Sequence, residues 1–152
     1  MASGNFVFPA KSKLNMFSAT DLLNPANTFK MTLHTSTFVP DDVNNEVYAD
    51  LANELATANG YTNGGLALTG VALTQTGGVV KFTCAAPVWT ASGGSIPAWR
   101  TAYVRAVGTL NGKVDPIVGH FIGDSTPADI PATTTGNTLT VTPNASGIMS
   151  AT

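Results

Sequence analysis

The chain has little charge and almost no cysteine. Only 11% of its 152 residues are charged, compared with roughly 25% in an average globular protein. Cys84 is the one cysteine, so no disulfide can form within the chain and no set of thiolates can hold zinc. It lies in an apolar stretch, where a lone cysteine is typically a small core residue. Low charge favours a protein that buries much of its surface against partners, although a merely neutral β protein has the same composition.

A basic patch and a long apolar run are also missing. The net charge is −2 and the seven basic residues are scattered along the chain, whereas a surface that follows nucleic-acid phosphates needs them clustered. No apolar run approaches the roughly 18 residues that span a bilayer, and the first residues lack the apolar stretch of a signal peptide. We therefore expect no nucleic-acid partner, no membrane partner and synthesis in a cytoplasm.

Glycine-punctuated strands occupy the middle of the chain, between residues 59 and 84. Leu66 to Thr74 and Val79 to Cys84 are β-rich runs joined by a short glycine-containing loop, which is a hairpin signal. The glycines before them provide backbone freedom at positive φ, and we predict a positive φ for at least one of Gly60 and Gly65. The predicted structural turn consists of Gly60, Tyr61, Gly64 and Gly65.

Alternating runs elsewhere predict one antiparallel β-sandwich, of which a jelly-roll is one form. In residues 28–38, Phe29, Met31 and Leu33 share one face and polar residues the other, which predicts a half-buried strand. We expect the sandwich domain to span residues 28–152, after an N-terminal arm and lead-in at 1–27. The predicted strands are 28–38, 66–74, 79–84, 100–110, 114–123 and 138–142.

Asp41 to Ala58 is the one helix candidate. Val47, Leu51 and Leu55 recur at a spacing of four, as on the apolar face of a helix, and Gly60 would end it. The opposite face of this helix carries Glu46, Asp50 and Glu54. This acidic face is either simply solvated or a ridge that meets a basic partner surface.

The arm is too apolar for a solvated tail. A Phe side chain left in water forfeits about 1.5–3 kcal/mol relative to burial. We therefore expect residues 1–12 to contact another chain, whereas in a free monomer the arm would be disordered or fold back on the sandwich. The apolar residues of the arm are Phe6, Val7, Phe8 and Pro9.

No set of residues converges as catalysis requires. His34 and His120 are the only histidines, and no spacing supports a metal site that they would share with Asp115 or Asp124. The serines lack the setting of a nucleophile elbow. We expect no enzymatic activity and no cofactor.

Two tryptophans mark a predicted loop over residues 85–98 and the strand after it. Trp89 and Trp99, with Tyr103, could stack on a sugar. At a loop–strand junction of a sandwich such rings are more often core or interface anchors. Both roles, carbohydrate binding and partner contact, stay open at this point.

Six motifs in a fixed order resemble a widespread family of small virion proteins of tailed bacteriophages. The Gly-Tyr-x-x-Gly-Gly segment is the most specific of them, and the resemblance covers residue 28 to the C-terminus. The matching segments are LHTS (33–36), ELATANGYTNGGLAL (54–68), Trp89, RTAYVRAV (100–107), VGHFIGD (118–124) and VTPNASGI (141–148).

The resemblance implies a structural protein that decorates and cements a capsid by bridging major capsid subunits. It implies a location on the virion surface, the major capsid protein as partner and a homo-oligomer, either a dimer or a trimer. The alternatives are a tail, head–tail adaptor or baseplate component and, from another class, a carbohydrate-binding module.

Overall fold

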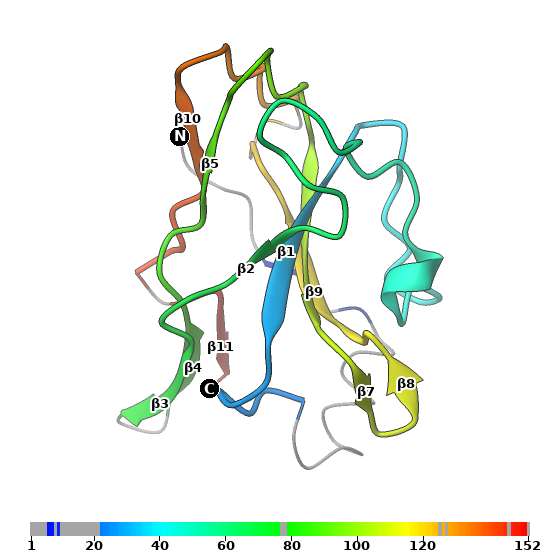
Figure 1. Ribbon diagram of the computed structural model, residues 1–152. Helices are drawn as coiled ribbons and strands as arrows, with labels where there is room; N and C mark the ends of the chain where they lie inside the picture. Colours follow the sequence, from blue (N-terminus) through cyan, green and yellow to red (C-terminus); the bar gives the residue numbers. More distant parts are fainter. Residues whose placement is uncertain are drawn as a thin grey trace.

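The computed structural model describes residues 6, 7, 9, 22–76, 79–124, 126, 128–145 and 147–151. This part of the chain is mainly β, with antiparallel pairing between neighbouring strands, as predicted (Figure 1). The elements in chain order are β1 (Phe29–His34), the 3-10 turn η1 (Tyr48–Asp50), β2 (Leu66–Ala67), β3 (Ala72–Thr76), β4 (Val79–Thr83), β5 (Val88–Thr90), β6 (Thr101–Ala106), β7 (Thr109–Leu110), β8 (Lys113–Val114), β9 (Ile117–Ile122), β10 (Thr138–Thr140) and β11 (Met149–Ala151).

The central sheet has four strands in the order β2-β1-β6-β9. Its register places Met31 opposite Val104 on an apolar face, and Thr32 opposite Tyr103 on a polar face. The prediction that β1 is half-buried is wrong, because its polar side chains Thr32 and His34 are 0% exposed. A later segment of the chain covers the polar face, so that this sheet is buried on both sides.

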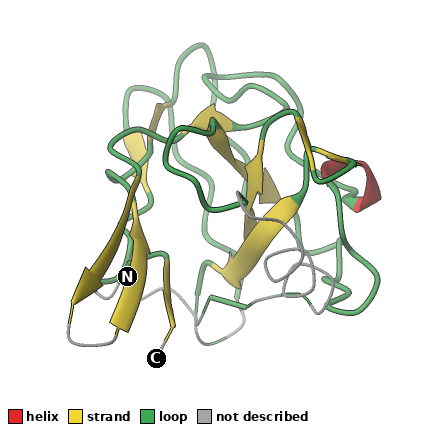
Figure 2. Ribbon diagram, turned by 90° about the horizontal axis from the view of Figure 1, so that it is seen from below, coloured by secondary structure: helices red, strands yellow, loops and turns green. Residues whose placement is uncertain are grey.

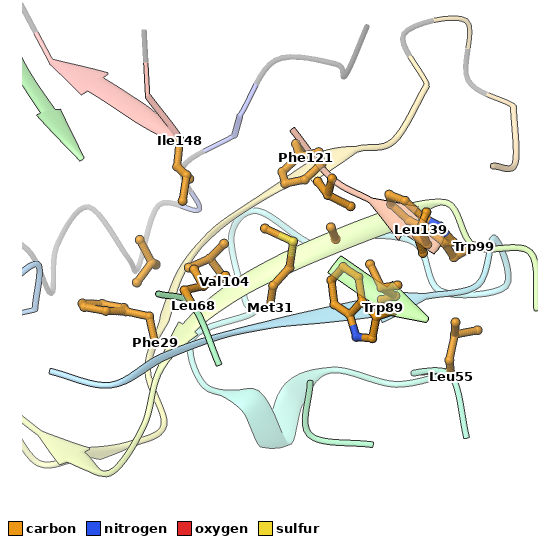
Figure 3. Close-up of a cluster of buried hydrophobic side chains, with 14 of the residues drawn as sticks. Phe29, Met31, Leu55, Leu68, Trp89, Trp99, Val104, Phe121, Leu139 and Ile148 are labelled. Atoms are coloured by element: carbon orange, nitrogen blue, oxygen red, sulfur yellow. The ribbon is translucent and has the colours of Figure 1, made fainter. Parts of the chain in front are cut away.

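Two smaller sheets, β11-β4-β3 and β10-β5, contribute to the main core over the apolar face. The Phe29 ring of β1 meets Phe82 of β4 edge to face, with 5.0 Å between ring centroids. Trp89 of β5 and Leu139 of β10 lie in the same cluster as Met31 (Figure 3). The core therefore holds the three sheets together by apolar burial.

The predicted hairpin of residues 66–84 forms, but its first strand is split. β3 and β4 pair from Ala72–Thr83 to Thr76–Val79, whereas β2 joins the central sheet. Gly70 lies between these two strands with φ +60°, and this conformation turns the chain from one sheet to the other. The predicted loop 85–98 is corrected in the same way, because it contains β5, which pairs with β10.

The predicted helix over Asp41 to Ala58 does not form, and η1 is the one helical turn in the described part of the chain. Short polar side chains take the local N–H groups: the Asp41 carboxylate accepts from Val43 and Asn44, and the Asp50 carboxylate from Glu46. Such local bonds compete with a helix. Backbone pairing with other strands outweighs the helical period of the apolar residues.

The glycine turn is confirmed. Asn59 and Gly60 have φ of 56° and 93° between the paired residues Ala58 and Tyr61, which is a tight turn that requires positive φ. Gly65 also has a positive φ, 80°. A Cβ at Gly60 would lie 1.9 Å from the Thr90 carbonyl oxygen, so the turn packs directly on β5.

Candidate binding surface

Residues 35–54, here called the strap, lie over the polar face of the central sheet. The strap runs down one side of the molecule to η1, opposite the three-stranded sheet that carries β11 (Figures 1 and 2). Its backbone is tied to the start of β9, because Tyr48 N–H donates to Asp115 O at 2.9 Å and Ile117 N–H to Glu46 O at 2.9 Å. The end of the strap returns to β1 through Leu55 N–H and Leu33 O, 2.9 Å apart.

An aromatic cluster lies beneath the strap. The Phe38 ring packs 5.5 Å from His34 and 5.9 Å from Tyr103, and Tyr103 stacks on His120 with 4.9 Å between centroids. The Tyr103 hydroxyl has no hydrogen-bond partner among the described residues. Burial, and then the negative charge of Asp42, raise its pKa. Phe38 thus anchors the strap to a layer that is aromatic but not apolar.

Burial favours the neutral form of both histidines in this layer. His34 donates from Nδ1 to Ala52 O at 2.8 Å, and its Nε2 lies 2.9 Å from the Thr32 hydroxyl, which can donate to a neutral imidazole. Burial lowers the pKa of His34. Burial also lowers the pKa of His120, although Asp42, 3.6 Å from its Nδ1, opposes this in part.

Arg105 ties three segments to the polar face. Its Nη1 lies 2.9 Å from the Asp115 carboxylate, and its Nη2 donates to Gly64 O at 3.0 Å. Its Cζ lies 4.2 Å from the centroid of the Tyr48 ring in η1. The Arg105 side chain is 6% exposed, so the loss of a partner would leave a buried charge unpaired.

Glu54 closes the strap against the glycine turn. Its carboxylate accepts hydrogen bonds from the Tyr48 hydroxyl, from the Tyr61 hydroxyl at 2.6 Å and from Gly64 N–H at 2.8 Å. The Tyr61 oxygen in turn accepts from Leu33 N–H at 3.0 Å. Burial, and then the bond to Glu54, raise the pKa of Tyr48 to about 12. The Gly-Tyr-x-x-Gly-Gly segment therefore binds the Glu54 carboxylate at the end of the strap through two hydrogen-bond donors, the Tyr61 hydroxyl and Gly64 N–H.

The outer side of this region presents valines to solvent. Val39 and Val43 of the strap are 78% and 64% exposed, and Val114 of β8 is 64% exposed. They are the most exposed large apolar side chains in the described part of the chain. The turn between Val39 and Val43 is fixed by Asp41, whose N–H donates to Asn45 Oδ1 at 2.9 Å. We call these three side chains the valine surface.

A shallow pocket of about 340 Å³ lies between η1 and the β7–β8 hairpin. Lys113 and Glu46 pair across it at 3.1 Å, with Lys113 42% and Glu46 16% exposed. Val47, Tyr48 and Val114 also line it. The strap and the hairpin thus meet at this pocket, with Val114 in its lining, while Val39 and Val43 lie on an earlier part of the strap.

The predicted acidic ridge of Glu46, Asp50 and Glu54 does not exist, because no helix aligns these side chains. Each carboxylate is bound within the chain instead. Glu46 pairs with Lys113, and Asp50 accepts from the N–H groups of Glu46 and Val47. Glu54 accepts from two tyrosines and a glycine.

Trp89 and Trp99 are both 3% exposed. Trp89 stacks on Tyr61 with 6.3 Å between ring centroids, and Trp99 packs under Ile130 and Gly123 in the core. Their burial argues against both a sugar-stacking role and a direct partner contact. Cys84 packs against the core, and burial raises its thiol pKa to about 11.

The described residues of the arm contact the chain's own β9. Val7 and His120 exchange backbone hydrogen bonds of 2.6 and 3.0 Å, and Phe6 packs 6.4 Å from the Phe121 ring. Pro9 is buried, whereas Phe8 lies outside the described residues. This is the fold-back arrangement expected for a free monomer.

The four residues considered for a metal site have separate surroundings. Asp115 pairs with Arg105, and Asp124 accepts from the N–H and hydroxyl of Thr126. His34 bonds to Thr32 and Ala52, as described above. Within the described residues, no three His, Cys, Asp or Glu side chains lie close enough to hold one ion.

Sequence reasoning missed the buried polar face and the valine surface. A signal for the first was present, because Lys30, Thr32 and His34 alternate in one strand as Thr101, Tyr103 and Arg105 do in another. Two paired strands with such rows form a continuous polar face, which here is covered. No period marks Val39 and Val43, which lie in irregular backbone.

No family model, curated protein or solved structure matches the chain. Among the described residues, no helix has the length and apolar character needed to cross a membrane.

Proposed function

We propose that the chain is a non-enzymatic structural protein of a tailed-phage virion, which decorates the capsid and cements it by bridging major capsid subunits. The six motifs suggest this class, and the valine surface is the observation that supports a protein-binding role. A homo-oligomer, a jelly-roll sandwich and a location on the virion surface belong to the same proposal.

The valine surface has the properties of a preformed contact. Its two segments are joined by the Val47–Pro116 bridge and the Lys113–Glu46 pair. A surface that is rigid before binding loses little conformational entropy on association. Burial of a valine contributes up to about 1.5 kcal/mol, so each contact is weak, but a shell with many equivalent sites makes weak contacts effective together.

The polar groups beneath the surface support a structural role. Arg105 and Glu54 are engaged with partners inside the chain, and the raised pKa of the Cys84 thiol disfavours a nucleophile. Arg105 and Glu54 hold the strap in place, Cys84 follows β4 in another sheet, and the three side chains do not converge on a reacting atom.

The test uses capsids, lacking this protein, of the phage that encodes the chain. The double variant Val43→Asp, Val114→Asp places two charges in the proposed contact, and we expect its occupancy on these capsids to fall at least tenfold. Val88→Asp is the matched control, because Val88 is 46% exposed on β5, outside the strap and the hairpin. Near-native occupancy is expected for the control.

Unchanged occupancy of a folded double variant would refute the valine surface as the contact. In a parallel measurement, purified tails replace the capsids. Binding to tails and not to capsids would replace decoration by the tail or adaptor alternative.

A further inference from the structure

The outer edge of β3 has backbone groups that nothing in the described chain uses. Thr76 pairs with Val79 across a connection of two residues, and such a closing pair exchanges both of its hydrogen bonds. The bonds alternate along the strand, so Thr74 and Ala72 also bond to β4. Leu73 and Gln75 therefore direct their N–H and C=O groups away from β4, and no described residue pairs with them.

The outer edge of β9, by contrast, is covered by other segments of the chain. β9 ends the central sheet, and its outer edge is bridged by Val7 at His120 and by Val47 at Pro116. Natural proteins commonly protect sheet edges by such cover, by charge or by proline. The sequence from Val71 to Thr76, VALTQT, has none of these devices, and Leu73 is 41% exposed.

We propose that β3 pairs edge to edge with β3 of a second copy of this chain, antiparallel and centred on Thr74. In this register Leu73 of each copy lies opposite Gln75 of the other. The outward N–H and C=O groups belong to Leu73 and Gln75, on either side of the two-fold axis at Thr74. Each Leu73 can therefore exchange two hydrogen bonds with Gln75 of the other copy, which gives four bonds in all. Sheet β11-β4-β3 would become one continuous six-stranded sheet across the two copies.

Charge does not oppose a second copy as the occupant. Residues 71–76 carry no charge, so two copies do not repel each other along the new edge. Lys81 is opposite Thr74 on β4, which places the two Lys81 residues about 14 Å apart, three strand spacings, in the dimer. At that distance physiological salt, with a Debye length of about 8 Å, largely screens their repulsion.

The contact is small, so the dimer is weak and depends on concentration. One strand of five residues buries much less than the roughly 800 Å² per partner of a stable complex. The proposal is independent of capsid binding, because it concerns the purified chain alone and a different edge of the fold.

Disulfide cross-linking tests the register directly. In the proposed dimer Thr74 faces its own copy in a non-hydrogen-bonded pair, with a Cα–Cα distance of about 4.5 Å, which a disulfide can bridge. In a Cys84→Ala background, we expect Thr74→Cys to give a covalent dimer on mild oxidation. Thr90→Cys is the control, since Thr90 is exposed on β5 and should stay monomeric. Equal cross-linking of the two variants would overturn the register.

Sedimentation measures the association without a cross-link. The mass of the native chain should rise towards that of a dimer between micromolar and millimolar concentrations. Gln75→Pro removes an outward N–H and leaves the bonds to β4 intact, so two of the four intermolecular bonds are lost, and we expect roughly thirtyfold weaker association.

A second variant keeps the backbone unchanged. Leu73→Lys places two like charges on diagonal neighbours across the two-fold axis, about 7–8 Å apart, and should weaken the dimer. Val88→Lys, on the exposed face of β5, should not. A native chain that remains monomeric from micromolar to millimolar concentrations overturns the proposal. A strand of another protein would then be the alternative partner for the β3 edge.

Discussion

The two faces of the central sheet are both buried, but different forces hold them. On one face Phe29, Met31 and Val104 pack against other strands, and apolar burial stabilises this contact in proportion to area. On the other face His34, Tyr103 and Arg105 meet the strap. Here the contacts are hydrogen bonds, ring stacking and an ion pair, which depend on direction as well as on area.

This difference indicates where stability and specificity lie. The apolar face would accept substitutions of similar volume at modest cost. The polar face gains little net energy from each bond, yet each broken bond leaves a buried group unsatisfied. We infer that the apolar face provides most of the folding energy, while the polar face determines the path of the strap and so the position of Val39 and Val43.

The largest expected effect is on the apolar face. Phe29→Ala removes a ring that is 0% exposed, and we expect the free energy of unfolding to fall by about 3–5 kcal/mol. Phe38→Ala, in the strap itself, is the comparison and should cost less, because Phe38 is only partly buried. Equal losses in urea titrations of both variants would contradict the division between the faces.

A second prediction concerns the glycine turn at Asn59-Gly60. It is followed by Tyr61, whose ring stacks on Trp89 and whose hydroxyl bonds to Glu54. At Gly60 a side chain would meet the Thr90 oxygen, and φ is +93°. Gly60→Val should therefore cost well above the roughly 1 kcal/mol of a propensity effect. Gly112 also follows an asparagine in a tight turn with positive φ, but a Cβ added there would have no atom within 4 Å.

Gly112→Val is thus the matched control, with the same backbone conformation and no steric clash. Thermal unfolding of both variants measures the difference. Similar losses at the two positions would mean that contact with β5 adds nothing to the strain of the turn.

The third prediction is for the polar face. Glu54→Gln replaces a carboxylate that receives three donors by an amide that cannot accept all of them, and we expect a loss of about 1–3 kcal/mol. Glu46→Gln is the control, because its pair with the partly exposed Lys113 contributes about 0–1 kcal/mol. If the two changes had the same effect in urea unfolding, the Glu54 contacts would be no more important than a surface pair.

The smallest expected effect is the dependence of stability on pH, which should come from the polar face and not from the apolar face. The pKa values of His34 and His120 are lowered by burial, so below pH 6.5 the unfolded chain binds more protons than the folded chain. Stability is therefore complete above pH 6.5 and decreases as the pH falls, by at most about 1.4 kcal/mol per pH unit for each histidine.

His120→Gln should flatten this dependence between pH 7 and 5, measured by urea unfolding at each pH. Phe29→Ala should leave the slope unchanged, because the apolar face has no titrating group. A slope that survives the replacement of both histidines would assign the effect to carboxylates elsewhere.

Local signals in the sequence predicted the local structure. Asn-Gly is a strong turn dipeptide, and Asn111-Gly112, with φ of 49° and 74°, turns between β7 and β8. The glycines at 60 and 65 adopt the backbone conformation that only their lack of a Cβ makes easy. Strand alternation in 28–38 predicted that Phe29, Met31 and Leu33 share one face, and all three are buried in the core.

The strap could not be predicted in this way. Val47, Leu51 and Leu55 have a helical period, but the carboxylates of Asp41 and Asp50 bind nearby N–H groups, and residues 46–48 pair with the start of β9. Those partners are some seventy residues away in the sequence, so no local pattern contains the information. The same holds for Glu54, whose role depends on which tyrosines reach it.

The contact between the arm and β9 has a consequence for the order of events during translation. The Phe6 ring fills the space over Gly119, where a Cβ would lie 2.2 Å from it. The arm leaves the ribosome more than a hundred residues before the strand that receives it. Contacts between such distant segments form slowly and late. Until its own β9 has been made, the arm of a nascent chain can therefore pair with the β9 of a finished chain nearby, including one released from a neighbouring ribosome.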